Sequence, residues 1–425
     1  MRYLYTLILY LLVPWIVLRL WLRSWREPGY TQYLGERFGS YRKVAGSPLI
    51  WVHAVSVGET RAAQPLIQAL LRDHPQHYVL ITHMTPTGRE AGRELFGGRV
   101  ERCYLPYDLP GAVGDFLDHY HPQAGILMET EIWPNLIHGC VRRGIPLYLV
   151  NARLSKKSWA GYRRVAGFTR KSLAGLTAIA AQSGGDAERF VGLGAGNVVV
   201  TGSIKFDVVP PPDQAELGRK FRRLYGAGRP VLLAASTREG EEDLILDELG
   251  HIEVPALLTV IVPRHPRRFD SVAAAIAQRG LKLQRRSDEA PIEPDTRVVL
   301  GDSMGEMLAY YGACDVAFIG GSLLPFGGHN LIEACAMGKP VIIGASVYNF
   351  PEPVRWAVEA GVAIKVRNAR ALAREATRLL RDPEAARRMG EIAAVFCSEH
   401  RGATAKIMDL IKLRTDESST VHRES

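Results

Sequence analysis

The run GSIKFDVVPPPDQAEL (residues 202–217) divides the chain into two halves that share one pattern. Three successive prolines, Pro210 to Pro212, force an extended backbone and remove the amide donors that a β-ladder requires. We therefore predict an interdomain linker over residues 207–228. The length of 425 residues agrees, because at roughly 150 residues per domain the chain is too long for one ordinary core.

Short apolar runs alternate with amphipathic stretches on both sides of this linker. Nearly continuous apolar strands are typical of a parallel sheet covered by helices on both faces. We predict an α/β fold of two facing, doubly wound, Rossmann-like domains, at residues 27–206 and 229–425. The runs that predict strands lie at residues 48–55, 77–84, 102–108, 124–130, 145–152, 177–183 and 197–202, and at 229–237, 256–265, 296–302, 314–322, 340–346 and 362–366.

Charge and cysteine content restrict the class of partner. The net charge of +9 favours ligands that carry phosphate or carboxylate, which include nucleic acid, an anionic membrane and acidic small molecules. No RNP-like aromatic motif, zinc-finger spacing or basic zipper occurs, so we expect no nucleic-acid partner. The five cysteines are widely spaced and have no metal-ligand pattern, which is typical of a protein in a reducing compartment.

The N-terminus is predicted to attach the protein to a membrane through residues 1–26. Residues 3–18 carry no charge, and Arg2 and Arg19 flank them. The run is shorter than the roughly 20 residues of a full span and contains Pro14, so a single span and a partly sunken interfacial helix both stay open. A buried core helix is the third alternative. The N-terminal segment lacks a small-residue cleavage site, so we expect it to stay uncleaved. The arginines that follow it predict that the rest of the chain lies in the cytoplasm.

The loop after the first predicted strand contains a candidate general base. In HAVSVGETRAAQPLI (residues 53–67), Gly58 permits a tight turn and Glu59 begins a helix. A carboxylate in this loop can accept a proton from an attacking hydroxyl if its pKa lies near the working pH. The alternative is a glutamate that only complements the helix dipole.

Other loops of the first half offer acceptor-binding candidates. Glu129 and Glu131 in METEIWPN (residues 128–135) form a Mg²⁺ site, or else one or both pair with an arginine or cap the following helix. We favour the second alternative because no D-x-D motif accompanies them. Hydroxyl and basic side chains in two further loops suit a phosphorylated acceptor, although solvated surface charge explains any single lysine equally well. These candidates are Thr85, Arg153 and Lys156.

The second half contains a glycine-rich run, GGSLLPFGGHNLIEACAMGKP (residues 320–340). Its glycines allow close backbone approach, and a helix that starts near Asn330 presents free N–H groups, so the run predicts a phosphate cradle. Glu333 either binds ribose hydroxyls or caps the helix. Two more loops, VPRHPRRF (262–269) and GDSMGEM (301–307), are expected at the same edge, as are Ser236 and Thr237 of AASTREGEE (234–242).

Nine motifs in order resemble one family, the bacterial 3-deoxy-D-manno-octulosonic acid (Kdo) transferases of lipopolysaccharide synthesis. The resemblance covers essentially the whole chain, including the hydrophobic N-terminus, and nine short motifs in register make coincidence improbable. The motifs are SVGE, TPTG, YLPYD, METEIWPN, NARLS, TGSIKFD, VPRHP, GDSMGE and GGSLLPFGGHNLIEA.

The resemblance implies a GT-B fold, CMP-Kdo as donor and a tetra-acylated, bis-phosphorylated lipid A precursor as acceptor. It further implies inversion at the anomeric carbon, no metal and no cofactor, and a place at the cytoplasmic face of the bacterial inner membrane. The family's catalytic base corresponds to Glu59. The CMP contacts correspond to Pro263, Arg264, Met304, Gly305, Glu306, Asn330, Leu331, Ile332 and Glu333.

Two rival functions stay open from the sequence. The first is another GT-B enzyme that acts on a sugar nucleotide, such as a heptosyltransferase or an epimerase. The second is a membrane-anchored lipid-binding protein without catalytic activity, for which Glu59 is dispensable.

Overall fold

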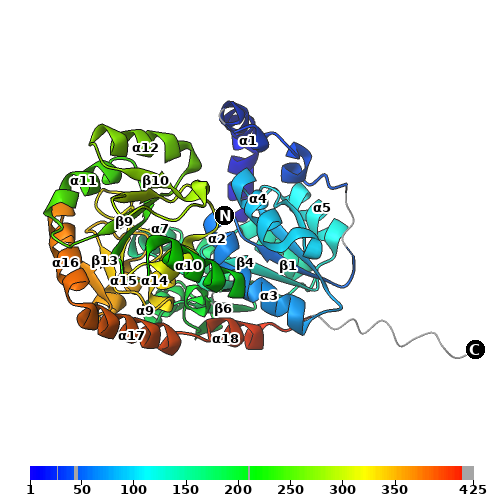
Figure 1. Cartoon of the computed structure of the whole chain (residues 1–425). Coiled ribbons are helices and arrows are strands. Elements are labelled where there is room, and N and C mark those ends of the chain that lie inside the picture. The colour runs from blue at the N-terminus through cyan, green and yellow to red at the C-terminus, as the bar shows by residue number, and fades with distance from the viewer. Residues whose placement is uncertain (26, 43–45, 209–210, 414–425) are drawn as a thin grey trace, which may run out of the picture. The chain divides into compact units, whose positions relative to one another are not determined.

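The computed structural model describes residues 1–25, 27–42, 46–208 and 211–413. They form two compact units, one of Met1–Asp207 with the chain from Arg401 onward, and one of Val208–His400. Each unit is built on one seven-stranded sheet flanked by helices (Figure 1). The predicted α/β class with two parallel sheets is therefore confirmed.

The sheet of the first unit has the strand order β3-β2-β1-β4-β5-β6-β7, and all its pairs are parallel. The order reverses between β1 and β4, where His53 lies opposite Leu127, and ligands bind at such switch points in doubly wound sheets. The strands are β1 Leu49–His53, β2 Tyr78–His83, β3 Glu101–Tyr104, β4 Ala124–Met128, β5 Leu147–Ala152, β6 Ala178–Ala181 and β7 Val198–Val200. The helices are α1 Arg2–Ser24, α2 Val57–Ala62, α3 Gln64–Asp73, α4 Pro86–Phe96, α5 Pro110–Tyr120, α6 Pro134–Arg142, α7 Lys156–Arg163, α8 Ala166–Leu173, α9 Gly184–Gly192 and α18 Ala403–Leu410.

The second sheet has the order β10-β11-β9-β8-β12-β13-β14, is also parallel, and reverses between β8 and β12. The strands are β8 Val231–Thr237, β9 Leu258–Pro263, β10 Leu283–Arg285, β11 Val298–Leu300, β12 Val316–Ile319, β13 Val341–Ile343 and β14 Ala363–Lys365. The helices are α10 Pro212–Tyr225, α11 Glu241–Glu248, α12 Phe269–Gln278, α13 Met307–Ala313, α14 Ile332–Ala336, α15 Pro351–Glu359, α16 Ala369–Arg381 and α17 Pro383–Glu399. The short strand β10 has no counterpart among the predicted strands.

Both faces of the first sheet are covered by apolar helix surfaces. On one face, Trp51 and Leu127 pack with Phe116 of α5 and Leu136 of α6. On the other face, strand residues pack with α3 and with Ile407 of α18. This two-sided burial explains why the strands are continuous apolar runs without alternation.

The predicted domain boundaries differ from the observed ones at both ends of the second unit. The predicted linker over residues 207–228 is largely helix α10, which starts at Pro212 and places Phe221 against Tyr310 of α13 at 5.1 Å. Proline is well tolerated in the first turn of a helix, so the proline run begins the helix as well as breaking the strand pattern. The last helix, α18, belongs to the first unit, because Asp207 caps it through the Gly402 and Thr404 amides.

The N-terminal helix α1 lies against the first unit along one stripe. Tyr5, Leu9, Val13 and Ile16 are half-buried and Leu20 is buried, at spacings of three and four residues. Leu20 is the one residue of α1 that is fully buried, while Leu4, Leu11, Leu18 and most other apolar side chains of α1 are exposed. By length and composition α1 is long and apolar enough to cross a membrane.

Candidate active site

Glu59 lies in the first turn of α2, directly after strand β1. Its carboxylate turns back toward the preceding loop and accepts hydrogen bonds from the Val55 amide, at 2.8 Å, and from the Ser56 hydroxyl, at 3.4 Å. Burial raises the pKa of Glu59 to about 8, and the nearby carboxylates of Glu129 and Glu131 add to the increase. A carboxyl with this pKa exchanges its proton close to neutral pH.

Two more carboxylates lie in the loop that follows the neighbouring strand β4. Strand β4 ends at Met128, and Glu129 adopts a left-handed conformation with φ of 61°, so Glu129 and Glu131 do not continue the strand as the spacing suggested. Glu129 forms an ion pair of 2.9 Å with Lys205, and Glu131 accepts a hydrogen bond from the Trp133 indole. Both carboxylates therefore already have partners, although these are a lysine and an indole and not the arginine or helix cap expected as the alternative to a metal.

Two buried histidines at the ends of β1 and β2 form hydrogen bonds next to these loops. His53, at the end of β1, contacts the Thr82 hydroxyl through Nδ1 at 2.8 Å, and His83 contacts the Ala54 carbonyl through Nδ1 at 2.9 Å. Burial lowers the pKa of His53 to about 3 and that of His83 to about 4, so both rings are neutral at physiological pH. We assign both histidines to positioning of the loops and not to proton transfer.

The corresponding edge of the second sheet carries positive charge. Arg238 follows β8, and Arg264 and His265 follow β9, where the Arg264 amide donates to the Thr237 carbonyl at 3.0 Å. His329 of the glycine-rich loop lies close enough that burial, then Arg264 and Arg238, lower its pKa to about 4. Arg238 and Arg264 are the cations of this cluster, and they can bind phosphate or carboxylate groups.

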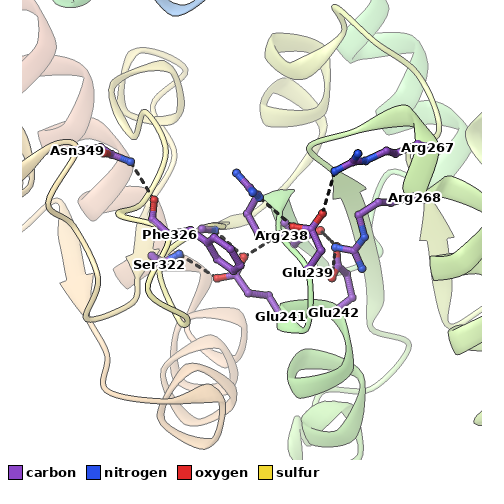
Figure 2. Close-up of polar contacts among 11 residues, drawn as sticks. Arg238, Glu239, Glu241, Glu242, Arg267, Arg268, Ser322, Phe326 and Asn349 are labelled. Carbon is purple, nitrogen blue, oxygen red and sulfur yellow. Dashed lines mark hydrogen bonds and ion pairs between the residues drawn. The ribbon is translucent and has the colours of Figure 1, made fainter. Parts of the chain in front are cut away.

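The glycine-rich loop is organised around the buried carboxylate of Glu241. The amides of Gly321, Ser322 and Leu323 donate to it at 2.6, 2.9 and 2.9 Å, and Figure 2 shows Glu241 pointing toward Ser322. Other amides of the loop are also engaged, since Gly327 donates to the Ser346 hydroxyl and Gly328 to the Gly321 carbonyl. The predicted phosphate cradle is thus wrong for this part of the loop, whose amides already have a protein acceptor.

Comparison with known proteins assigns the chain to a family. A family model described as 3-deoxy-D-manno-octulosonic-acid transferase (kdotransferase) matches residues 32–208, and a model for group 1 glycosyl transferases matches residues 276–395. The 3-deoxy-D-manno-octulosonic acid transferase of Bordetella pertussis is 43% identical over 97% of this chain and 99% of its own length. The enzyme of the same name from Haemophilus influenzae is 38% identical over 97% of this chain and 98% of its own length. The chain belongs to the Kdo transferase family.

The fold comparison agrees with this assignment at a coarser level. The UDP-GlcNAc 2-epimerase of Neisseria meningitidis superimposes with a TM-score of 0.60, over 85% of this chain and 99% of the other. The two sequences are 16% identical, so the similarity shows a shared GT-B-like fold and nothing about the reaction. The Kdo transferase is a glycosyltransferase, as the motifs indicated.

The predicted acceptor residues have different environments in this Kdo transferase. Thr85 caps helix α4, since its hydroxyl accepts from the Gly88 amide at 3.0 Å and donates to the Val55 carbonyl at 3.3 Å. It therefore ties α4 to the loop that precedes Glu59. Lys156 is exposed at the start of α7, and the Arg153 carbonyl accepts a hydrogen bond from the Thr130 hydroxyl next to Glu129.

The predicted CMP-binding residues lie at the carboxyl edge of the second sheet. Pro263 ends β9 and Arg264 follows it, while Gly305 adopts φ of 81° in the exposed turn after Met304. Glu306 forms an ion pair of 2.9 Å with Arg286. The Asn330 side chain accepts from the Ile332 amide at 3.2 Å and donates to Glu333 at 3.3 Å, and Leu331 and Ile332 are buried.

Sequence reasoning missed four residues of these two edges. Lys205 belongs to TGSIKFD, one of the nine family motifs, but no role follows for this lysine from the motif. Arg238 and Glu241 lie in AASTREGEE beside the two hydroxyl residues that were singled out, and His329 lies inside the glycine-rich run. Their place directly after a predicted strand was the available signal.

Proposed function

We propose that this Kdo transferase uses CMP-Kdo as donor and a lipid A precursor as acceptor, and that it inverts the anomeric centre. The second unit is proposed to hold the donor, through Pro263 and Arg264, residues 304–306 and residues 330–333. Its arginines support this assignment, because a nucleoside monophosphate attached to an acidic sugar presents two negative charges. The first unit is proposed to hold the acceptor.

The raised pKa of Glu59 is the observation that carries the mechanism. In the proposed step the acceptor hydroxyl transfers its proton to the Glu59 carboxylate, and the hydroxyl oxygen forms a bond to the anomeric carbon. The bond from that carbon to the phosphate oxygen breaks, and CMP leaves with the electron pair. One base opposite the leaving group produces inversion, and cationic side chains stabilise the charge on the departing phosphate.

We also propose that α1 holds the enzyme at the cytoplasmic face of the bacterial inner membrane. Its contacts with the first unit extend from Tyr5 to Leu20, about 22 Å at 1.5 Å per residue. A helix held along this length by a polar domain fits the interfacial alternative better than a span, because its exposed apolar face can lie in the headgroup region. Deletion of residues 1–22 is expected to release the protein from membranes.

Incubation of the purified protein with CMP-Kdo and, separately, with other sugar nucleotides tests the donor and the acceptor. We expect release of CMP from CMP-Kdo only when the lipid acceptor is present, with a mass increase of the lipid that also gives the number of Kdo residues added. The configuration of the new linkage, determined by NMR, tests inversion. Absence of CMP release in the presence of the lipid would overturn the proposal.

A further inference from the structure

The first unit contains an apolar cavity between α1 and the body of the unit. It has a volume of about 260 Å³, with one wall formed by Leu9, Val13 and Ile16 of α1 and the other by Leu109, Ile132 and Trp133. Pockets for drug-sized molecules are usually larger, at roughly 300–1,000 Å³. The size and lining therefore fit one slender apolar group.

The buried carboxylate at this cavity, Asp108, is already engaged. Asp108 accepts hydrogen bonds from the Tyr5 hydroxyl at 3.0 Å, and from the amides of Asn135 and Leu136 at 2.9 and 2.7 Å. A cavity lined by apolar carbon, with its carboxylate saturated by protein donors, gives water few partners and favours an apolar guest.

The outer surface of α1 connects this cavity with the membrane. Leu4, Leu11 and Leu18 are 54%, 71% and 51% exposed on the same helix whose inner stripe lines the cavity. Apolar surface of this extent on a helix flanked by arginines is typical of a helix that lies in a membrane interface. A hydrocarbon chain can therefore pass from the bilayer to the cavity along apolar side chains of one helix.

The wall opposite α1 connects the cavity with Glu131, one of the carboxylates near Glu59. Trp133 lines the cavity and donates its indole N–H to Glu131, whose carboxylate contributes to the raised pKa of Glu59. Ile132 of the same loop also lines the cavity. A hydrocarbon chain bound in the cavity contacts residues next to Glu131 in sequence. The headgroup attached to that hydrocarbon chain is thereby positioned near Glu59.

We propose that this cavity binds one acyl chain of the acceptor lipid and so places the acceptor headgroup beside Glu59. The proposal rests on the proposed function, since it names a binding subsite for that acceptor. The chain that enters is the acceptor's own and not that of a bulk phospholipid, because the wall that it contacts is the loop that carries Glu131.

Variants that fill the cavity test this proposal. Val13→Trp narrows it from α1 and Ile132→Trp narrows it from the opposite wall, while Val191→Trp, at an exposed position of α9, is the matched control. KM is measured in detergent micelles for the acylated acceptor, for the same phosphorylated disaccharide without acyl chains, and for CMP-Kdo. Flotation with phospholipid vesicles measures membrane binding.

We expect both filling variants to raise KM for the acylated acceptor about tenfold, with unchanged KM for CMP-Kdo and for the stripped disaccharide, and unchanged flotation. Val191→Trp should behave as the wild type. An equal change for both acceptors would indicate a structural defect or a bulk lipid in the cavity, and no change would mean an empty cavity, so either result overturns the proposal. Absence of transfer by the wild type would instead refute the proposed function.

Discussion

Two glutamates occupy corresponding places in the two units but have opposite surroundings. Glu59 and Glu241 each lie in the first turn of the helix that follows the first strand of their unit. Glu241 is fully buried and receives the amides of Arg238, Gly321, Ser322 and Leu323. Glu59 receives one amide and one long hydroxyl contact, and two further carboxylates lie near it.

The difference shows that one position in a doubly wound sheet can hold a carboxylate with many hydrogen-bond donors or with few. Four amide donors stabilise the Glu241 carboxylate and bind the glycine-rich loop to α11. Glu59 has too few donors to offset its burial, so it takes up a proton near neutral pH. The comparison predicts that removal of charge abolishes activity at one position and weakens the fold at the other.

The largest expected effect is that of Glu59→Gln. Without a base the acceptor hydroxyl keeps its proton, and we expect kcat to fall roughly 100-fold or more, within the usual 10²–10⁴ range for such groups. The loss of kcat is measured as the rate of CMP release during transfer of Kdo to the lipid acceptor. Glu94→Gln, at an exposed position of α4, is the control and should keep wild-type activity.

The fold of Glu59→Gln should be intact. Because the pKa of Glu59 is higher in the folded protein than its ordinary value of 4.5, folding takes up a proton, and the stability that Glu59 confers is lost as pH rises from about 4.5 through about 8. Glutamine removes this dependence, so the variant should be at least as stable as the wild type at pH 8. A clear drop in its melting temperature there would contradict a catalytic assignment.

The second prediction concerns Glu241→Gln. The amide of glutamine offers one acceptor oxygen in place of a charged carboxylate, and leaves buried N–H donors unmatched. We expect the second unit to lose at least about 2 kcal/mol of unfolding free energy. Thermal denaturation should show a lowered transition, whereas Glu239→Gln, which breaks only partly exposed ion pairs, should change it little. If Glu241→Gln were as stable as Glu239→Gln, the Glu241 carboxylate would not stabilise the fold, and its contrast with Glu59 would not hold.

The third prediction uses the pH profile of transfer. The base must be deprotonated, so kcat/KM, which reports the pKa of the free enzyme, should rise about tenfold per pH unit below about 8 and level off above it; this rise is the acidic limb of the profile. Glu129→Gln removes a carboxylate that raises the pKa of Glu59, and should move this limb to lower pH. Lys205→Met leaves Glu129 without its cation and should move the limb to higher pH. The position of the limb is the readout, and shifts in the same direction would show that Glu59 does not set it.

Much of the fold could be predicted from the sequence, because buried parallel strands consist of short apolar runs that stand out from the segments around them. Position after a strand also placed Glu59 and Arg264 correctly at the carboxyl edges of the two sheets. The function of individual loops was harder to predict, since it depends on contacts between distant segments. Glu241 binds amides some 80 residues away, which no local pattern near TREGE shows. The place of α18 depends likewise on Asp207, almost 200 residues earlier in the chain.

The smallest expected effect, none at all, is that of metal removal. Among the described residues, no group of three or more His, Cys, Asp or Glu side chains is placed to hold a metal ion. Glu129 is bound to Lys205 and Glu131 to Trp133, so the two carboxylates that follow β4 already have protein partners. Arg238 and Arg264 at the edge of the second sheet can stabilise a departing phosphate, as Mg²⁺ does in other transferases. We therefore expect full transfer in EDTA. Activity that returned only with added Mg²⁺ would mean that the cations of the second unit do not suffice, and that the division of charge between the two edges is not the basis of catalysis.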